Sequence, residues 1–305
     1  MTVKMPVVIA AVMAGVWTAC GADAEAAKAA EGSPRALKVL MIGNSFSICV
    51  GYTMPQVAKS MGLDLELCSL YIGGCPLKRH WENWVAGTNA DFRPYRLDRY
   101  VNGRKTVDNG KANIPEALGF ADWDIVTFQQ ASDGSWRSET YQPYAADLQA
   151  AIRARLPKAE FVWQETWSYT PWDGRLKKWG IDQAGMYEKL HAAYAANAKG
   201  QRIIPMGTAV QLWRKQLPVA YRPDSLGGDL CGADSFEKKA DGTFKHKGDA
   251  CHLNKSGEYL QALVWTAKLY GVDVRTCAYA PKHIPAEKAE LMKRVAMEAV
   301  AQSAK

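Results

Sequence analysis

The stretch Lys38-Val39-Leu40-Met41-Ile42-Gly43-Asn44-Ser45-Phe46-Ser47 predicts the architecture of the chain. It opens with a short apolar run that is typical of a buried strand, and the Gly-Asn-Ser-Phe segment that follows predicts a turn. A helical pattern then continues to about Met61 and closes at Gly62. A buried strand that passes through a turn into a helix is the repeating unit of a parallel α/β sheet.

Similar apolar runs recur along the chain, and segments with helical periodicity separate them. The runs are Leu63–Ile72, Asp124–Phe128, Glu160–Trp163 and Arg202–Met206, and the helical segments include Tyr141–Arg155 and Met186–Ala198. This alternation predicts an α/β fold, a three-layer α/β/α sandwich around a mostly parallel sheet. The segments Ser256–Tyr270 and Ala286–Ala304 have apolar positions three and four residues apart, so we expect both helices on a flank of the sheet.

The chain has 305 residues and 48% hydrophobic content, which is enough to bury the core of one α/β domain. We expect this single domain to span residues 37–305. Residues 78–114 interrupt the alternation, because several aromatic residues and a basic turn at residues 101–105 stand between short β-like pieces. This pattern predicts an insertion above the sheet.

The formal net charge of +7 comes from Lys and Arg residues that are spread along the whole chain. The sequence has no clustered basic run of the kind that follows a phosphate backbone or an anionic membrane, so we expect no nucleic-acid partner. No protein partner is predicted either.

The first residues follow the pattern of an export signal. Lys4 supplies the positive start, and the apolar run Val7–Val16 is too short to span a bilayer as a helix. Two processing sites compete. Thr18-Ala19-Cys20-Gly21 resembles a bacterial lipoprotein box, although Trp17 stands where Leu is usual, whereas Ala22-Asp23-Ala24 suits an ordinary signal peptidase.

We therefore expect residues 1–24 to be a signal peptide and residues 25–36 to be a flexible tether. The expected location is outside the bacterial cytoplasm: periplasmic, extracellular or, through a lipid on Cys20, anchored to a membrane.

Six cysteines remain once Cys20 is set aside as removed or lipidated. In an oxidising compartment an even number favours one or more disulfides, whereas buried free thiols are the equally weighted alternative. Neither the CxxC pairs of a redox site nor the His spacing of a zinc site is present, so we expect no metal. The six are Cys49, Cys68, Cys75, Cys231, Cys251 and Cys277.

Ser45 is the first candidate for chemistry, because it opens a helix directly after a strand. The carboxyl ends of parallel strands collect reactive groups, and a helix N-terminus favours developing negative charge. Taken alone, however, a Ser after Gly-Asn is more often a simple helix cap.

The second candidate segment is Lys247-Gly248-Asp249-Ala250-Cys251-His252-Leu253-Asn254, which precedes the last sheet-flanking helices. A Ser hydroxyl needs a general base, and the base needs a carboxylate that fixes its tautomer. Among the five His residues, His252 is the one with an acidic residue, Asp249, three positions earlier in a loop that enters a helix. The alternative is a surface His beside a neighbouring Asp.

Together, the two segments resemble the first and last signature blocks of the SGNH/GDSL serine hydrolases, with Ser45 as nucleophile and Asp249 and His252 as its partners. The resemblance covers roughly Leu37 to Gly271 and implies a flavodoxin-like sheet of five strands. The strings GNSFS, YIGGC and WDIVTFQQAS, and the Trp-rich strand end at Gln164-Glu165-Thr166-Trp167, look like a poorly characterised bacterial branch of this superfamily.

By position, the resemblance implies an oxyanion hole. Its donors would be the backbone amides of Ser45 and of Gly73 or Gly74, and the side-chain amide of Gln130, with Gln129 as the alternative. The sequence departs from the usual motifs twice, since Asn44 stands where Asp is usual and a Gln stands where Asn is usual. The Gln carries an extra methylene, so it needs a shifted backbone to reach the oxyanion. Plain turns and strand ends are the alternative explanation for these residues.

The resemblance implies acyl transfer through Ser45, without a metal or an organic cofactor. The chain has eleven Trp residues, and flat rings near the catalytic edge could stack on sugars, as expected for an esterase that removes acetyl groups from a polysaccharide. The alternative is that the rings belong to the core. The rings near loops or strand ends are Trp81, Trp84, Trp123, Trp136, Trp163, Trp167 and Trp172, and the substrate-binding candidates are Trp81, Gln129, Trp136 and Trp167.

Two other functions stay open at this point. The chain could be a carbohydrate-binding protein that keeps the fold and has lost turnover through its Gln and Asn departures. It could also be a cysteine-dependent redox protein that uses Cys251 beside His252, although Cys251 does not follow a strand-to-helix turn and its thiol could pair with Cys231.

Overall fold

The computed structural model describes residues 36–89, 91–216, 228–232, 236–238, 240–241, 244–246 and 249–303. The predicted signal peptide, Cys20 and the tether up to residue 35 lie outside these residues, and Ala36 already belongs to the first strand. Among the helices of the described part, none has the length and apolar character needed to cross a membrane.

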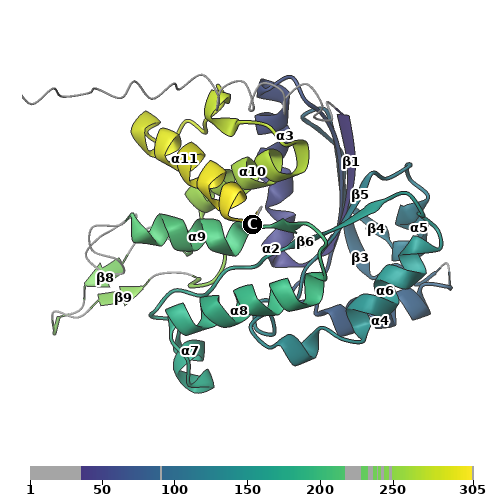
Figure 1. Cartoon of the computed structure of the whole chain (residues 1–305), viewed down its shortest axis with the longest axis horizontal. Helices are drawn as coiled ribbons and strands as arrows, with labels where there is room; N and C mark the ends of the chain where they lie inside the picture. Colours follow the sequence, from purple (N-terminus) through teal and green to yellow (C-terminus); the bar gives the residue numbers. More distant parts are fainter. Residues whose placement is uncertain are drawn as a thin grey trace, which may run out of the picture. The chain divides into compact units, whose positions relative to one another are not determined.

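Five parallel strands form the centre of the main sheet, in the order β2-β1-β5-β6-β7. Each lies on one of the predicted apolar runs, and β1 and β5 are buried along most of their length. The predicted α/β class with a mostly parallel sheet is therefore confirmed (Figure 1). The bounds are β1 (Ala36–Gly43), β2 (Asp64–Tyr71), β5 (Ile125–Phe128), β6 (Glu160–Gln164) and β7 (Ile203–Ile204).

A hairpin of two antiparallel strands, β3 (Tyr95–Val101) and β4 (Arg104–Ala112), extends the sheet beyond β2 to seven strands. The prediction that this segment lies above the sheet was wrong. The edge of β2 offers free backbone groups for pairing, and Asn102 and Gly103 adopt positive φ angles of 44° and 84°, which suit a tight hairpin turn.

Helices cover both faces of the sheet and complete three layers (Figure 1). On one side α10 packs against α3, α9 and α11, and on the other side α4 packs against α5 and α6, with α8 following β6. The bounds are α3 (Val50–Ser60), α4 (Leu77–Ala86), α5 (Ile114–Leu118), α6 (Tyr144–Arg153), α8 (Gln183–Ala198), α9 (Met206–Lys215), α10 (Lys255–Tyr270) and α11 (Ala286–Gln302).

Shorter elements connect these layers or stand beside them. They are α2 (Ser45–Ile48), the 3-10 helices η1 (Ser138–Thr140) and η2 (Val274–Thr276), α7 (Gly174–Trp179), and the separate hairpin β8 (Phe236–Lys238) and β9 (Phe244–His246).

Helix α10 fixes one side of the candidate site, because it is buried along nearly its whole length. Asn254 caps its start by accepting a hydrogen bond from the Gly257 amide at 3.0 Å. The loop that precedes this cap carries Asp249 and His252, and the His252 carbonyl accepts a hydrogen bond from the Gly232 amide at 2.7 Å. The buried helix and this backbone contact therefore hold the loop at the end of β1.

Candidate active site

Ser45 is the first residue of α2, and one residue, Asn44, separates it from the end of β1. Glycine at position 43, the last residue of β1, leaves room for the Ser47 side chain, since a Cβ atom there would lie 2.2 Å from the Ser47 hydroxyl oxygen. Asn44 caps α2 by accepting a hydrogen bond from the Phe46 amide at 3.0 Å. The cap is thus Asn44, which leaves the Ser45 hydroxyl available for other contacts.

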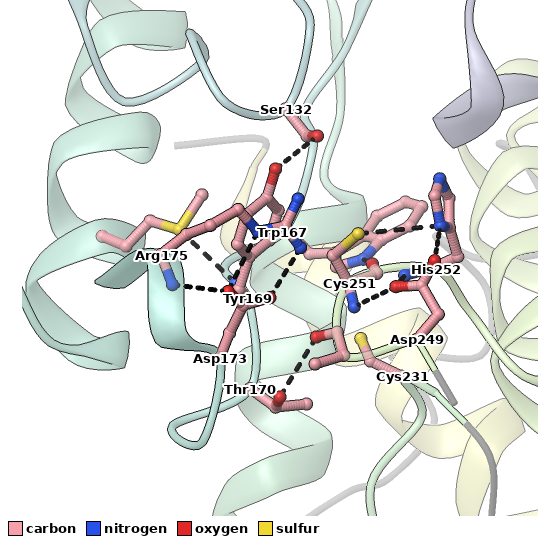
Figure 2. Close-up of polar contacts among 12 residues, drawn as sticks. Ser132, Trp167, Tyr169, Thr170, Asp173, Arg175, Cys231, Asp249, Cys251 and His252 are labelled. Carbon is pink, nitrogen blue, oxygen red and sulfur yellow. Dashed lines mark hydrogen bonds and ion pairs between the residues drawn. The ribbon is translucent and has the colours of Figure 1, made fainter. Parts of the chain in front are cut away.

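The structure brings the three predicted catalytic side chains together. His252 Nε2 lies 2.7 Å from Ser45 Oγ, although 207 positions separate the two residues in the chain. On the other side of the ring, His252 Nδ1 is in hydrogen-bond contact with Asp249 Oδ2 (Figure 2). This is the arrangement in which an imidazole can take a proton from a hydroxyl while a carboxylate holds its tautomer.

Asp249 has a strongly stabilised negative charge. Its Oδ1 accepts hydrogen bonds from the backbone amides of Cys251 at 2.7 Å and His252 at 3.1 Å. Burial alone would raise the pKa of the Asp249 carboxyl, but the hydrogen bonds from Cys251 and His252 outweigh burial and hold that pKa well below its usual range. Asp249 is therefore ionised at neutral pH, as a partner for an imidazolium must be.

Two buried glutamines hold the backbone of the nucleophile turn. The Phe46 carbonyl accepts a hydrogen bond from Gln164 Nε2 at 2.6 Å and one from Gln261 Nε2 at 2.8 Å. Gln261 also accepts a hydrogen bond from the Cys49 thiol at 2.8 Å. Sequence reasoning missed both roles. For Gln261 the only signal in the sequence was its position as a single polar residue among the apolar residues of α10.

Trp167 packs against the nucleophile turn from inside the core and does not face substrate. Its ring is fully buried and stacks on Phe46 at 4.2 Å between ring centroids, and its indole nitrogen donates to the Cys251 carbonyl at 2.7 Å. Phe46 in turn lies 5.4 Å from the His252 ring. The expectation that Trp167 binds substrate was wrong, because the ring links the Ser45 turn to the Asp249–His252 loop from within the core.

The contacts of Asn44 explain why Asn stands where Asp is usual. Its Nδ2 donates to the Cys75 carbonyl at 3.1 Å, and its Oδ1 accepts from Gln129 Nε2 at 2.5 Å. Aspartate could accept from Gln129 but could not donate to Cys75 while ionised. Asn44 and Gln129 therefore form a matched pair. Gln129 is 1% exposed, so the expectation that it contacts substrate was wrong.

The Gly73–Gly74 turn lies beside the nucleophile turn, as expected for a backbone oxyanion donor. The Ile72 amide donates to the Gly43 carbonyl at 3.2 Å, and the Asn44 contact to Cys75 fixes the other end of the turn. Gly74 has a positive φ of 60°, which favours glycine at this position.

Gln130 contradicts the prediction for its side chain. Its Nε2 donates to the Thr140 carbonyl at 2.9 Å and to the Thr140 hydroxyl at 3.0 Å. Its Oε1 accepts hydrogen bonds from the backbone amides of Leu77 and Ala131. The amide is thus used to join loops, and it is not free to bind an oxyanion.

Trp81 and Trp136, the other substrate-binding candidates, are both half-buried. Trp81 lies on α4 and packs against the core, and Trp136 packs on Trp179 with 5.6 Å between ring centroids. Neither contact links these rings to the Ser45 turn.

All six cysteines outside the signal region are buried free thiols, so of the two alternatives left open by the sequence the structure has free thiols and not disulfides. Burial raises the pKa of the Cys251 thiol to about 12, which keeps it protonated and makes it a poor nucleophile. Its sulfur lies 3.6 Å from His252 Nδ1.

The Cys251 thiol also bears on metal binding. Ligand atoms of Asp249, Cys251 and His252 lie within 4.8 Å of one another and could in principle hold a metal ion. Asp249 and His252 already contact each other, however, and His252 Nε2 contacts Ser45 Oγ. The contacts of Asp249 and His252 suit proton transfer better.

Cavities open on two sides of these residues. One of about 500 Å³ is lined by the Asp249–His252 loop and by residues 172–175, and another of about 460 Å³ is lined by Gly74, Gln130, Thr140 and Tyr144 among others. One cavity thus lies on the His252 side of the site and the other on the Gly74 side.

The chain is similar to several proteins of known structure. A solved structure of a DUF4886 family protein from Bacteroides uniformis is 26% identical and covers 88% of this chain and 96% of its own, with a TM-score of 0.74. A putative SGNH hydrolase from Slackia heliotrinireducens is 23% identical, covers 75% of this chain and 97% of its own, and has a TM-score of 0.48. An acetylxylan esterase from Geobacillus stearothermophilus is 12% identical, covers 77% of this chain and 95% of its own, and has a TM-score of 0.45.

The last two likenesses are too distant to support an argument about this chain. No curated protein matches it. A family model described as a domain of unknown function, DUF4886, matches residues 38–219, which is more than half of the sequence. The chain therefore belongs to the DUF4886 family.

Proposed function

We propose that this protein is a serine ester hydrolase in which Ser45 is the nucleophile, His252 the general base and Asp249 the residue that orients His252. The observation that carries the proposal is the contact of 2.7 Å between His252 Nε2 and Ser45 Oγ, with Asp249 on the opposite ring nitrogen. A helix cap would not explain these contacts, since Asn44 already caps α2.

In the proposed reaction, His252 takes the proton of Ser45 as its oxygen attacks the ester carbonyl. The backbone amides of Ser45 and of the Gly73–Gly74 turn stabilise the oxyanion. His252 then returns the proton to the leaving alcohol, and water releases the acid from Ser45 by the same steps in reverse roles. Apart from the water, every group that acts in these steps belongs to this chain.

The proposed substrate is an acetyl ester of a carbohydrate, and the proposed location is outside the cytoplasm. The polar character of the cavity beside His252 supports a hydrophilic alcohol.

The test is release of acetate from p-nitrophenyl acetate and from acetylated xylan by wild type, Ser45→Ala and His252→Ala. Each change should lower kcat by at least about 10⁴-fold, because members of such a triad act as a unit. Mass spectrometry after treatment with a fluorophosphonate should place one adduct on Ser45.

Matched controls are available for both variants. Ser47→Ala removes a neighbouring buried hydroxyl, and His191→Ala removes a second His that contacts a carboxylate, Glu165, at 2.7 Å. Both controls should keep most of the activity. Glycan binding without hydrolysis, equal in wild type and Ser45→Ala, would instead support a carbohydrate-binding protein.

A further inference from the structure

A cavity opens next to His252. It encloses about 500 Å³, and its walls are the Asp249–His252 loop on one side and Trp172, Asp173, Gly174 and Arg175 on the other. The second wall comes from the end of the segment between β6 and α7 and from the first two residues of α7. The following inference rests on the proposed esterase activity.

The direction of proton transfer decides which part of an ester lies in this cavity. His252 must protonate the oxygen of the leaving alcohol, so that oxygen has to come within hydrogen-bond reach of its Nε2 atom. The acyl oxygen, by contrast, points towards the Ser45 amide and the Gly73–Gly74 turn. The alcohol therefore extends along the His252 side, into the cavity that His252 lines.

Arg175 is held rigidly at the wall of this cavity. Its Nε donates to Asp173 Oδ1 at 2.9 Å and its Nη2 donates to Asp173 Oδ2 at 2.6 Å (Figure 2). Its guanidinium also stacks over the Tyr169 ring at 4.1 Å. The Asp173 side chain is 6% exposed and that of Arg175 is 42% exposed, so Asp173 positions the guanidinium and Arg175 presents it to a ligand.

The composition of the walls selects the chemical class of the alcohol. A long alkyl chain would displace water from the exposed parts of the guanidinium and of the Asp249 carboxylate and would offer no hydrogen bond in return, which is costly. An anionic alcohol would meet the carboxylates of Asp173 and Asp249, while the one guanidinium is already paired. A neutral alcohol with several hydroxyl groups and one flat apolar face meets neither obstacle.

We propose that this cavity is the subsite for the leaving alcohol and that it binds the ring of a neutral sugar. Trp172 packs on the apolar face of the sugar ring, and Arg175 donates hydrogen bonds to its hydroxyl groups. Asp173 is a positioning residue that keeps the guanidinium in place. These residues set the specificity for the alcohol, and Ser45 and the Gly73–Gly74 turn act on the acyl group.

The test compares esters that share the acetyl group and differ in the alcohol. Ethyl acetate is measured beside mono-O-acetylated methyl glycosides of xylose, glucose and galactose, and the best of the three sugars is used for the ratio. Trp172→Ala and Arg175→Gln should each lower kcat/KM for the sugar ester about 10-fold more than for ethyl acetate, mainly through KM. Trp84→Ala, which removes a half-buried Trp that contacts Arg155 elsewhere, should lower both values by the same factor.

Equal losses for the two kinds of ester in Trp172→Ala and Arg175→Gln would overturn the subsite, as would wild-type protein that cleaves ethyl acetate but no sugar ester. Failure of the proposed activity gives a different result, since hydrolysis would then persist in Ser45→Ala. Calorimetry offers a readout without turnover. The acetylated sugar should bind to Ser45→Ala. The double variant with Ser45→Ala and Trp172→Ala should bind it with a Kd about 10-fold higher.

Discussion

Asn44→Asp is the most informative single change, because it replaces one side-chain atom in a buried cluster. The Asn44 side chain donates to the Cys75 carbonyl at 3.1 Å and accepts from Phe46 and Gln129. The new carboxylate keeps both acceptor contacts but places an oxygen where the donor was. At neutral pH two oxygens would then face each other in a site that is 1% exposed.

The expected loss in the free energy of unfolding is about 1–3 kcal/mol at pH 7, the usual cost of a buried acceptor without its donor. For a domain of this size this lowers Tm by about 2–4 °C per kcal/mol. Protonation restores a donor, so the folded state raises the pKa of the introduced carboxyl. The deficit relative to wild type should therefore grow as the pH rises above about 3.9, the value for an exposed Asp.

Urea unfolding of wild type and variant at several pH values measures this deficit. Asn113→Asp is the matched control, since Asn113 is buried and caps α5 through its side-chain oxygen, which accepts from the Glu116 amide at 2.8 Å. That change keeps the acceptor and should cost little. If Asn44→Asp unfolds at the same urea concentration as wild type at pH 7, the contact to Cys75 does not hold the Gly73–Gly74 turn.

Three further outcomes are expected. Burial lowers the pKa of His80 to about 3, so between pH 6.5 and 3 the unfolded chain binds a proton that the folded protein does not, and stability falls as pH is lowered. When the free energy of unfolding is measured by urea titration at several pH values, His80→Gln should reduce its dependence on pH by up to about 1.4 kcal/mol per pH unit. An unchanged dependence would contradict the lowered pKa of His80. Gln130→Ala should lower the free energy of unfolding by about 1–3 kcal/mol and reduce kcat less than about 10-fold, whereas a loss of about 100-fold or more would restore its role as an oxyanion donor. Cys251 should resist a thiol reagent at pH 8 until the protein is unfolded, as intact-mass analysis can show, and rapid labelling of the folded protein would argue against its buried, protonated state.

The central strands could be predicted because each combines a short apolar run with a turn signal, as Lys38 to Asn44 does. The hairpin of β3 and β4 could also be recognised as β-like pieces from Tyr95 onwards. Its place in the sheet could not be predicted, because the alternation of apolar and polar residues does not specify which strand a hairpin pairs with, here β2.

The contact of Ser45 with His252 could be anticipated because strand ends and the loop before a flanking helix converge in a parallel sheet. The roles of Gln261 and Trp167 could not. A single Gln in an apolar helix does not indicate which group it will hydrogen-bond in the folded protein. A Trp near a strand end has the same sequence pattern whether it faces solvent or the core. Gln130 was misassigned for a similar reason, since its partner Thr140 is reached only through the folded loops.

The great separation of Ser45 and His252 along the chain has a consequence for biosynthesis. During translation Ser45 is synthesised long before Asp249 and His252. Residues 38–219, which match the family model, are complete before either of these two residues is added. The imidazole meets the hydroxyl near the place where α10 packs against α3, the helix that follows the nucleophile turn. A nascent or truncated chain would thus carry an ordinary, unactivated serine, and proposed hydrolysis would begin only with the finished molecule.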